Sequence, residues 1–481
     1  MSHTDASSLT LALSHYNLLQ ETPAPPGYPL YFAMGTVINF FFSNPHLSLV
    51  FESALFSGIG AVAFYLFGKS IGGIKTGIIS SLLFLCAPSL YFFGLTVYPY
   101  VVVISIYTIF IWIAYLIIIK KEFKRWLPLG FVYALLIGTR PQELITTLPL
   151  FVFAALVLPK FYKLKTFIVF IIITLVWLIP FLSFVGGIGS YVAVSSRAAS
   201  QAIPSPSLIQ FVAKKFELLS GLYLTLGVGL LILPLYAVVF IKKIIEKKWR
   251  TKVNRKKVIF ILLWVLPVLF FNLFIRTEHV GYQSGYLIFL LLVISCAMPR
   301  LFKKNSILII AAALVAAVNL FIFFQDRDPG YKKAYRQSSF HYSDIRRNDY
   351  ELSNKISYIN RNFSPQKTII IAGPFFWRHA RYYLPEYLLY EIDAIAQDMD
   401  NSNTRRDAKN LLFRSYQSNN RFFVVPPGIN AIVLFDDDMD EWVTTSKKVA
   451  SFKGTAKLTV LTVKGGDTVK YGYHRLEVVA K

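Results

Sequence analysis

Arg140 is the residue whose position in the sequence most clearly suggests a role in binding or catalysis. It separates two apolar runs at a Thr-Arg-Pro turn and stands three residues before Glu143. Burying a cation among apolar side chains costs free energy unless the cation pairs with an anion or binds a ligand. A guanidinium can bind two phosphate oxygens at once. An Arg140–Glu143 ion pair that only closes the turn explains the same residues. The sequence leaves both interpretations open.

Asp5, Glu52 and the segment 98–100 could contribute to the same site. Asp5 is the only aspartate before residue 325 and could serve as a general base, although a helix N-cap over residues 6–19 is the simpler interpretation. Glu52 lies near the start of an apolar run, where its carboxylate could pair with a cation or face a water-filled cleft. Tyr98 and Tyr100 flank Pro99 and could line that cleft or belong to an aromatic belt at the membrane surface.

Three further clusters of polar residues have a functional and a simpler interpretation. Arg276 and His279 precede a tyrosine-rich turn and could hold a phosphate, or they could anchor the turn at the membrane interface. Residues 377–383 could receive a sugar or phosphate, but a helix start with a solvated face is favoured. Residues 436–441 could bind a hard cation, but a strand end leading into a capped helix is favoured. No P-loop, dinucleotide fingerprint or nucleophile elbow is present.

The elements that position these residues are predicted to be membrane helices. Of 481 residues, 55% are hydrophobic and 16% are charged, which excludes a soluble enzyme and a disordered chain. Residues 29–43 are apolar but short and are expected to form a helix in the outer interface. The expected spans are 47–68, 74–95, 99–119, 126–139, 141–159, 167–187, 218–241, 258–275, 281–298 and 306–324.

Positive charge sets the expected orientation of these spans. Most Lys and Arg residues before residue 325 lie in loops on one side, which the positive-inside rule places in the cytoplasm. Both termini, the turn at Arg140 and the loop after residue 275 are then outside. The net charge of +24 therefore reflects membrane topology and anionic lipid, not nucleic acid.

A change in composition after residue 324 predicts a second domain. Residues 325–481 are expected to form a small extracytoplasmic α/β domain with helices at 344–361 and 404–416. Its expected strands are 368–372, 421–425, 431–435, 457–463 and 475–479. The fold class is thus mainly α: a polytopic membrane domain over 1–324, with residues 1–46 as an outer loop, followed by the α/β domain.

The order of several motifs resembles the GT-C membrane glycosyltransferases, and most closely bacterial relatives of protein O-mannosyltransferases. The likeness covers about residues 1–324 and is most specific in 4–31. It rests on Asp5, Pro25–Tyr31, Tyr98-Pro99-Tyr100, Gly138–Gln142, Leu148-Pro149-Leu150, Trp264–Pro267, Arg276, His279 and Gly285-Tyr286. The superfamily has a helix before its acidic loop, so the resemblance also implies a helix upstream of Asp5 that the printed sequence lacks.

This resemblance implies transfer of a hexosyl or pentosyl group from a polyprenyl-phosphate sugar to a hydroxyl of a protein, lipid or glycan acceptor, at the plasma (inner) membrane. Asp5 matches the catalytic position and would act as base in an inverting reaction. The donor phosphate would be bound by Arg140, Arg276 and His279, and the cleft lined by Tyr28, Glu52, Tyr98, Tyr100 and Glu143. No cofactor is assigned. A divalent cation stays open, although Thr4 and Ala6 flank Asp5 where many members of the superfamily have a second acidic residue.

Other classes of protein remain to be separated from this one. A transporter or lipid flippase would need inverted repeats and charges at mid-membrane, and the sequence shows neither. A non-catalytic scaffold predicts that changing Asp5 or Arg276 alters stability alone. A polysaccharide polymerase or ligase would use the same lipid donor and differ only in its acceptor.

Overall fold

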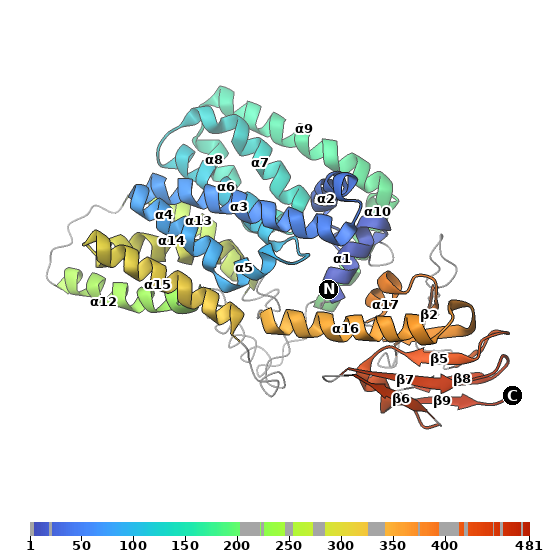
Figure 1. Cartoon of the computed structure of the whole chain (residues 1–481). Helices are drawn as coiled ribbons and strands as arrows, with labels where there is room; N and C mark the ends of the chain where they lie inside the picture. The colour runs from blue at the N-terminus through green and yellow to red at the C-terminus, as the bar shows by residue number, and fades with distance from the viewer. Residues whose placement is uncertain are drawn as a thin grey trace. The chain divides into compact units, whose positions relative to one another are not determined.

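The computed structural model is mostly helical and ends in a small domain built on β-sheets (Figure 1). It describes residues 4–18, 22–202, 222, 226–245, 254–272, 284–325, 342–373, 376–393, 413–417, 422–445, 447–452, 456–472 and 475–481. The chain divides into two compact units, one of residues 12–342 and one of Met1–Leu11 with Ser343–Lys481. The boundary predicted at 324/325 stays a prediction, and the units are described separately below.

The helical unit is built from apolar helices joined by short connections. Their bounds are α2 Pro29–Phe42, α3 Pro45–Gly72, α4 Ile74–Cys86, α5 Pro88–Gly94, α6 Tyr100–Ile118, α7 Trp126–Thr139, α8 Glu143–Val157, α9 Lys160–Val185, α10 Ile188–Ala202, α12 Ile232–Ile245, α13 Arg255–Phe270, α14 Ser284–Leu301 and α15 Asn305–Phe324. Short 3-10 turns, η2 (Phe123–Arg125) and η3 (Gly227–Leu231), precede α7 and α12. Helices therefore lie at each predicted span within the described residues.

Several of these helices can cross a membrane on length and composition. Among the described residues these are α3, α6, α9 and α15, and α4 with α5 makes a fifth that is bent by 66°. The bend lies at Ala87, because Pro88 cannot continue the helix before it. The chain is a multi-pass membrane protein.

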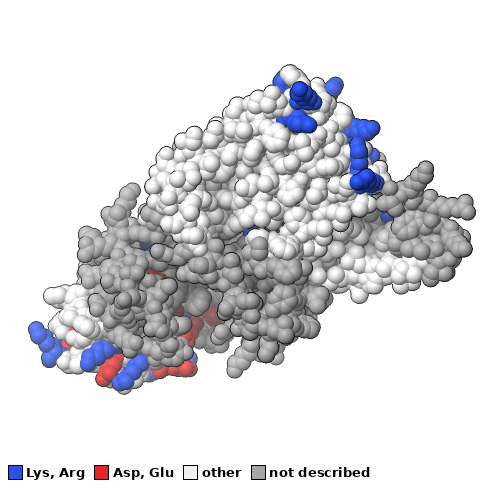
Figure 2. All heavy atoms as spheres, turned by 180° about the vertical axis from the view of Figure 1, so that it is seen from behind, with Lys and Arg blue, Asp and Glu red and all other residues white. Residues whose placement is uncertain are grey.

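Burial divides the helices into a core and a lipid-facing layer. Nearly all of α6 is buried, and Ser105 ties it to α3 by donating to the carbonyl of Phe56 at 2.7 Å. By contrast, α9 leaves large apolar side chains such as Ile172 and Val176 exposed, as helices that face lipid do. Figure 2 shows Lys and Arg gathered at one end of the unit, over the α6–α7 connection and the start of α9, beside a broad uncharged face.

The C-terminal domain has three layers. A six-stranded sheet of order β3-β2-β1-β5-β7-β6 is formed by β1 (Thr368–Ala372), β2 (Leu388–Asp393), β3 (Phe413–Gln417), β5 (Ala431–Leu434), β6 (Lys448–Ser451) and β7 (Lys457–Thr462). Neighbouring strands from β3 to β5 pair in parallel, and β7 pairs antiparallel with both β5 and β6. Helices α16 (Tyr342–Asn362) and α17 (Trp377–Tyr383) cover one face. An antiparallel sheet of β4 (Phe422–Val424), β8 (Thr468–Gly472) and β9 (Arg475–Val479) covers the other.

The predicted strands of this domain are confirmed, whereas one predicted helix is wrong. Residues 413–417, expected at the end of a helix over 404–416, form strand β3 paired in parallel with β2. The rest of that expected helix lies outside the described residues. Pairing with β2 outweighs the local preference for helix, because propensity is a weak prior beside tertiary context.

Candidate functional site

The turn between α7 and α8 carries a buried ion pair. Arg140 Nη1 lies 3.0 Å from Glu143 Oε1, and the two side chains are only 2% and 8% exposed. The chain turns tightly here, since the amide of Arg140 donates to the carbonyl of Leu136 and that of Glu143 to the carbonyl of Arg140. Glu143 thus opens α8 while Arg140 ends α7, and both side chains lie inside the helical unit.

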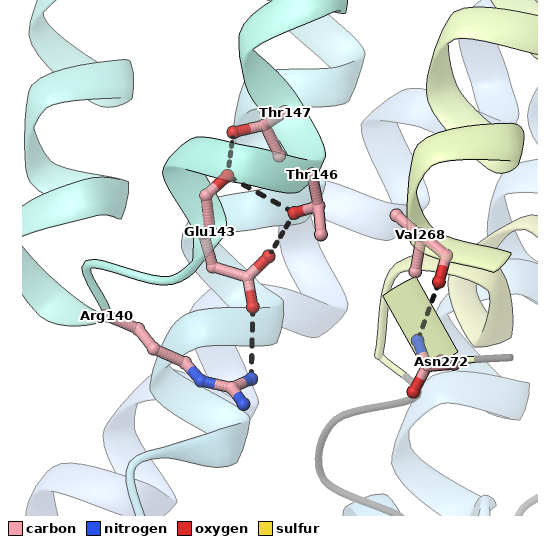
Figure 3. A network of polar contacts seen from close by, with 6 residues as sticks. All are labelled: Arg140, Glu143, Thr146, Thr147, Val268 and Asn272. Carbon is pink, nitrogen blue, oxygen red and sulfur yellow. Dashed lines mark hydrogen bonds and ion pairs between the residues drawn. The ribbon is translucent and has the colours of Figure 1, made fainter. Parts of the chain in front are cut away.

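Two threonines hold Glu143 in place (Figure 3). Thr146 donates to Glu143 Oε2 at 2.9 Å, and Thr147 donates to the Glu143 backbone carbonyl. They lie one turn along α8, at the spacing where helical side chains meet. One carboxylate oxygen thus binds the guanidinium and the other binds a hydroxyl. Such a doubly anchored carboxylate fixes the orientation of Arg140.

Aromatic rings lie beside the guanidinium. Arg140 Cζ is 5.8 Å from the centre of the Tyr100 ring, a cation–π distance. Tyr100 in turn stacks on Tyr98, with ring centres 5.5 Å apart and planes 16° apart. Both tyrosines are buried, so they do not form the exposed aromatic belt that the sequence left open. They are part of the wall around Arg140.

The segment of residues 25–31 packs directly against the Arg140 turn. Gly138 allows this approach, because a Cβ there would lie 2.5 Å from Leu30 Cδ1 and 2.8 Å from Trp177 Cε2. Tyr28, just before α2, adopts a left-handed backbone (φ 51°), an unusual conformation for a residue that is not glycine and one that often marks functional segments. The structure therefore brings together two motifs that are more than a hundred residues apart.

A third part of the network joins α6, α13 and α14. Trp264 Nε1 donates to the carbonyl of Gly285 at 3.1 Å, and Tyr107 Oη is 2.9 Å from where a Cβ on Gly285 would lie. Tyr107 also interacts electrostatically with Glu143. On the same side, Asn272 is buried at the end of α13 and donates to the carbonyl of Val268 (Figure 3). The start of α14 is thereby tied to α13 beside Tyr107.

The remaining predicted site residues have different outcomes. Glu52 lies on α3, fully buried, beside Ser53, which donates to the carbonyl of Tyr98 at 3.4 Å. Asp5 lies within α1 (Thr4–Ser14), so it is not the N-cap of that helix, and its side chain is outside the described residues. Arg276 and His279 also lie outside the described part of the chain.

Sequence reasoning missed several members of the network. Thr146 and Thr147 could have been found, since they follow Glu143 at the three- and four-residue spacing of one helical face. Asn272 and Tyr107 offered a weaker signal, since each is a polar residue within a mostly apolar segment. The contact of Leu30 with Gly138 gave none, because it depends on how the helices pack.

The acidic turn of the C-terminal domain is held by its own neighbours. Asp436 is buried after β5 and accepts a bond from the Gly373 amide at 3.0 Å, while Lys355 Nζ lies 2.7 Å from Asp437 Oδ1. Burial raises the pKa of Asp436 to about 7, and the Gly373 bond and Lys355 partly oppose that rise. Among the described residues no group of three or more potential ligands could hold a metal ion. These contacts fit a structural turn.

The second C-terminal cluster is a short helix packed on the sheet. In α17, Trp377, His379 and Ala380 are buried, so the helix presents only part of its surface to solvent. Burial lowers the pKa of Arg381 to about 10, and the charge of Glu391 opposes the shift. This agrees with the favoured interpretation of a helix, although its face is less solvated than expected.

Comparison with known proteins identifies the fold. No family model matches the sequence, and no curated protein matches it. Among solved structures, the chain is similar to ArnT from Cupriavidus metallidurans in the apo state, with a TM-score of 0.59 and 11% identity over 96% of this chain and 93% of ArnT. The structure of the same ArnT bound to undecaprenyl phosphate gives a TM-score of 0.58 at the same identity and coverage.

A weaker similarity links the chain to the Archaeoglobus fulgidus oligosaccharyltransferase. The TM-score is 0.45 at 13% identity over 92% of this chain and 64% of that one, for the complex with zinc and sulfate. The ArnT similarity shows that the chain shares the overall fold of ArnT. The expected mostly helical fold with several apolar helices and a small C-terminal sheet domain is confirmed. Membership of the GT-C superfamily and the closer likeness to O-mannosyltransferases stay predictions.

Proposed function

We propose that this chain is an integral-membrane glycosyltransferase that uses a polyprenyl-phosphate sugar. The observation that carries the proposal is the Arg140–Glu143 pair, an oriented and buried cation inside an ArnT-like fold. A planar guanidinium matches phosphate oxygens, and an ArnT structure in the same fold holds undecaprenyl phosphate. The transferred group is a hexose or pentose, and the acceptor is a hydroxyl of a protein, lipid or glycan.

The proposed topology places this site at the outer face of the plasma (inner) membrane. The ten spans are α3, the bent α4–α5 pair, α6, α7, α8, α9, α12, α13, α14 and α15. The basic end seen in Figure 2 then faces the cytoplasm, and the α7–α8 turn faces outward. The C-terminal domain and Asp5 are on that outer side too. A lipid-linked donor would keep its tail in the bilayer and its phosphate near Arg140.

The proposed reaction is a single displacement. The acceptor oxygen attacks the anomeric carbon, the bond from that carbon to the phosphate oxygen breaks, and the electron pair leaves with the phosphate. Asp5 accepts the proton of the acceptor hydroxyl. Arg140, with Arg276 and His279, stabilises the charge that grows on the leaving phosphate. The configuration at the anomeric carbon is inverted.

Turnover of a defined donor tests this function. Purified wild-type protein in nanodiscs, given undecaprenyl-phosphate mannose or glucose and a membrane extract as acceptor source, is expected to release undecaprenyl phosphate. Asp5→Asn and Arg140→Gln should each abolish most of that release, whereas Arg125→Gln, a change at an exposed arginine, should not. No release from any polyprenyl-phosphate sugar would overturn the proposal, and a product of retained configuration would overturn its mechanism.

A transporter or flippase is the second candidate, and a scaffold the third. The ArnT-like fold supports neither, and the described charged pair lies at a helix turn, not at the middle of a broken span. The same assay separates them, since a flippase would move the intact lipid-linked sugar and leave its glycosidic bond unbroken. A scaffold would do neither.

A further inference from the structure

Helix α3 buries a carboxyl group for which the structure shows no hydrogen-bond partner. Glu52 is 0% exposed, and neither Oε1 nor Oε2 has a partner among the described residues. Tyr31 on α2 is also 0% exposed, and its hydroxyl has no partner there either. The two groups are near enough to interact electrostatically. They are called the Glu52–Tyr31 pair below.

The pair lies where α1, α2 and α3 meet. A Cβ placed on Gly35 of α2 would be 3.1 Å from Glu52 Oε2, 3.3 Å from Leu13 Cδ1 and 2.7 Å from Leu49 Cδ2. Gly35 is one helical turn after Tyr31, so both lie on one face of α2. The Glu52 carboxyl and the ends of the Leu13 and Leu49 side chains therefore all lie next to Gly35.

An unpartnered buried pair of this kind is expensive. Each polar group buried without a hydrogen bond costs about 1–3 kcal/mol, and a charged one costs more. A leucine at position 52 and a phenylalanine at position 31 would remove that cost without changing the helices. Native proteins satisfy nearly all of their buried polar groups, so such exceptions need an explanation such as a ligand.

The chemical groups of the Glu52–Tyr31 pair indicate which part of the donor they bind. An ionised carboxylate repels a phosphate, and a neutral carboxyl group lacks the positive charge that a phosphate needs, so the pair does not bind the donor's phosphate. A carboxyl group and a phenol hydroxyl accept and donate hydrogen bonds, as the hydroxyl groups of a sugar do. The pair is also linked to the Arg140 site, because Leu30 packs on Gly138 and Ser53 bonds to Tyr98.

We propose that Glu52 and Tyr31 bind hydroxyl groups of the transferred sugar, while Arg140 binds its phosphate. This inference rests on the proposed function. The sugar displaces the ends of Leu13 and Leu49 and supplies the partners that both groups lack. Glu52 and Tyr31 then set which sugar is accepted, because a site built to bond a hydroxyl rejects an analogue without it.

The proposed role of the Glu52–Tyr31 pair is tested by comparing the binding of a lipid phosphate with and without an attached sugar. The full protein in nanodiscs is titrated with undecaprenyl phosphate and with undecaprenyl-phosphate mannose and glucose. Wild type should prefer one sugar-linked lipid over the bare lipid phosphate. Glu52→Leu and Tyr31→Phe should each lower that preference by about 10- to 100-fold, leave the affinity for undecaprenyl phosphate unchanged, and keep or raise thermal stability. Glu52→Gln should recover part of the preference.

The possible outcomes distinguish a failure of this inference from a failure of the proposed function on which it rests. Glu122→Leu, at an exposed glutamate of the α6–α7 connection, is the matched control and should change nothing. If wild type binds no undecaprenyl lipid, the proposed function fails and this inference fails with it. If wild type binds and prefers the sugar-linked lipid but both pair variants keep that preference, only the pair's role is overturned. A loss of stability with unchanged preference would mark the pair as structural and overturn it too.

Discussion

The buried Arg140–Glu143 pair makes the sharpest prediction. Glu143→Ala removes the carboxylate that binds Arg140 Nη1 at 3.0 Å and Thr146 Oγ1 at 2.9 Å. Removing one partner of a buried ion pair costs about 3–5 kcal/mol, because a charge stays in a region of low polarity without its counter-charge. The Arg140 and Glu143 side chains are 2% and 8% exposed, so solvent screens the loss little. Glu143→Ala should therefore lower the unfolding free energy by about that amount.

The double variant Arg140→Met/Glu143→Leu separates stability from function. Apolar side chains of similar volume often replace a buried ion pair at no cost, so the double variant should recover most of the lost stability. It should not recover turnover, because no guanidinium remains to bind the phosphate. Stability is measured by SDS-induced unfolding in mixed micelles, followed by tryptophan fluorescence, and turnover by release of undecaprenyl phosphate.

A second Arg–Glu pair provides the control. Glu122 and Arg125 have the same three-residue spacing and a distance of 3.3 Å, but their side chains are about half exposed. Exposed pairs contribute about 0–1 kcal/mol, so Glu122→Ala should have little effect. The reasoning is refuted if Glu122→Ala and Glu143→Ala cost the same. It is also refuted if the double variant is as unstable as Glu143→Ala, or if it keeps wild-type turnover.

Three other predictions follow from the geometry. The raised pKa of Asp436 means that the folded domain keeps a proton that the unfolded chain loses between pH 4 and about 7, so stability falls as pH rises through that window. Asp436→Asn should therefore stabilise the domain at pH 8, by an amount on the order of 4 kcal/mol, and have little effect at pH 4, measured by hydrogen exchange of peptides from β1 and β5. Gly35→Ala should destabilise the α2–α3 contact by about 1–3 kcal/mol, measured by thermal unfolding, because its Cβ meets Leu49 at 2.7 Å; an unchanged midpoint would contradict this. Trp264→Phe should cost about 0.5–1.5 kcal/mol in the same assay through loss of the bond to the Gly285 carbonyl, and a gain in stability would contradict it.

Local features of the fold were predictable from the sequence. Apolar length predicted helices such as α2 at 29–43 and α3 at 47–68, and the structure has them at Pro29–Phe42 and Pro45–Gly72. Runs of β-branched residues predicted β1 and β5. Strands β2, β6 and β8 were missed, since they mix charged with apolar residues. Their pairing in the sheets decides their structure, and pairing is not a local property.

In the candidate site, too, local contacts were predictable from the sequence and packing contacts were not. The three-residue spacing of Arg140 and Glu143 indicated an ion pair as one of two open interpretations, and the structure shows that pair at 3.0 Å. Nothing in the sequence predicted that Gly138 would lie against Leu30, or Trp264 against Gly285, because these contacts come from helix packing. The sequence also could not predict that the Glu52 carboxyl would lack a hydrogen-bond partner, since this depends on all the side chains that surround it.

The most direct test of the central claim is native mass spectrometry of the protein released gently from its own membranes. Wild type is expected to carry a polyprenyl phosphate or its sugar-linked form, and the added mass would identify the sugar. Arg140→Gln should lose that lipid, whereas Arg125→Gln, the exposed control, should keep it. A wild-type spectrum without any polyprenyl phosphate, or equal occupancy in the Arg140→Gln variant, would contradict the account of Arg140 as the phosphate-binding residue of a membrane glycosyltransferase.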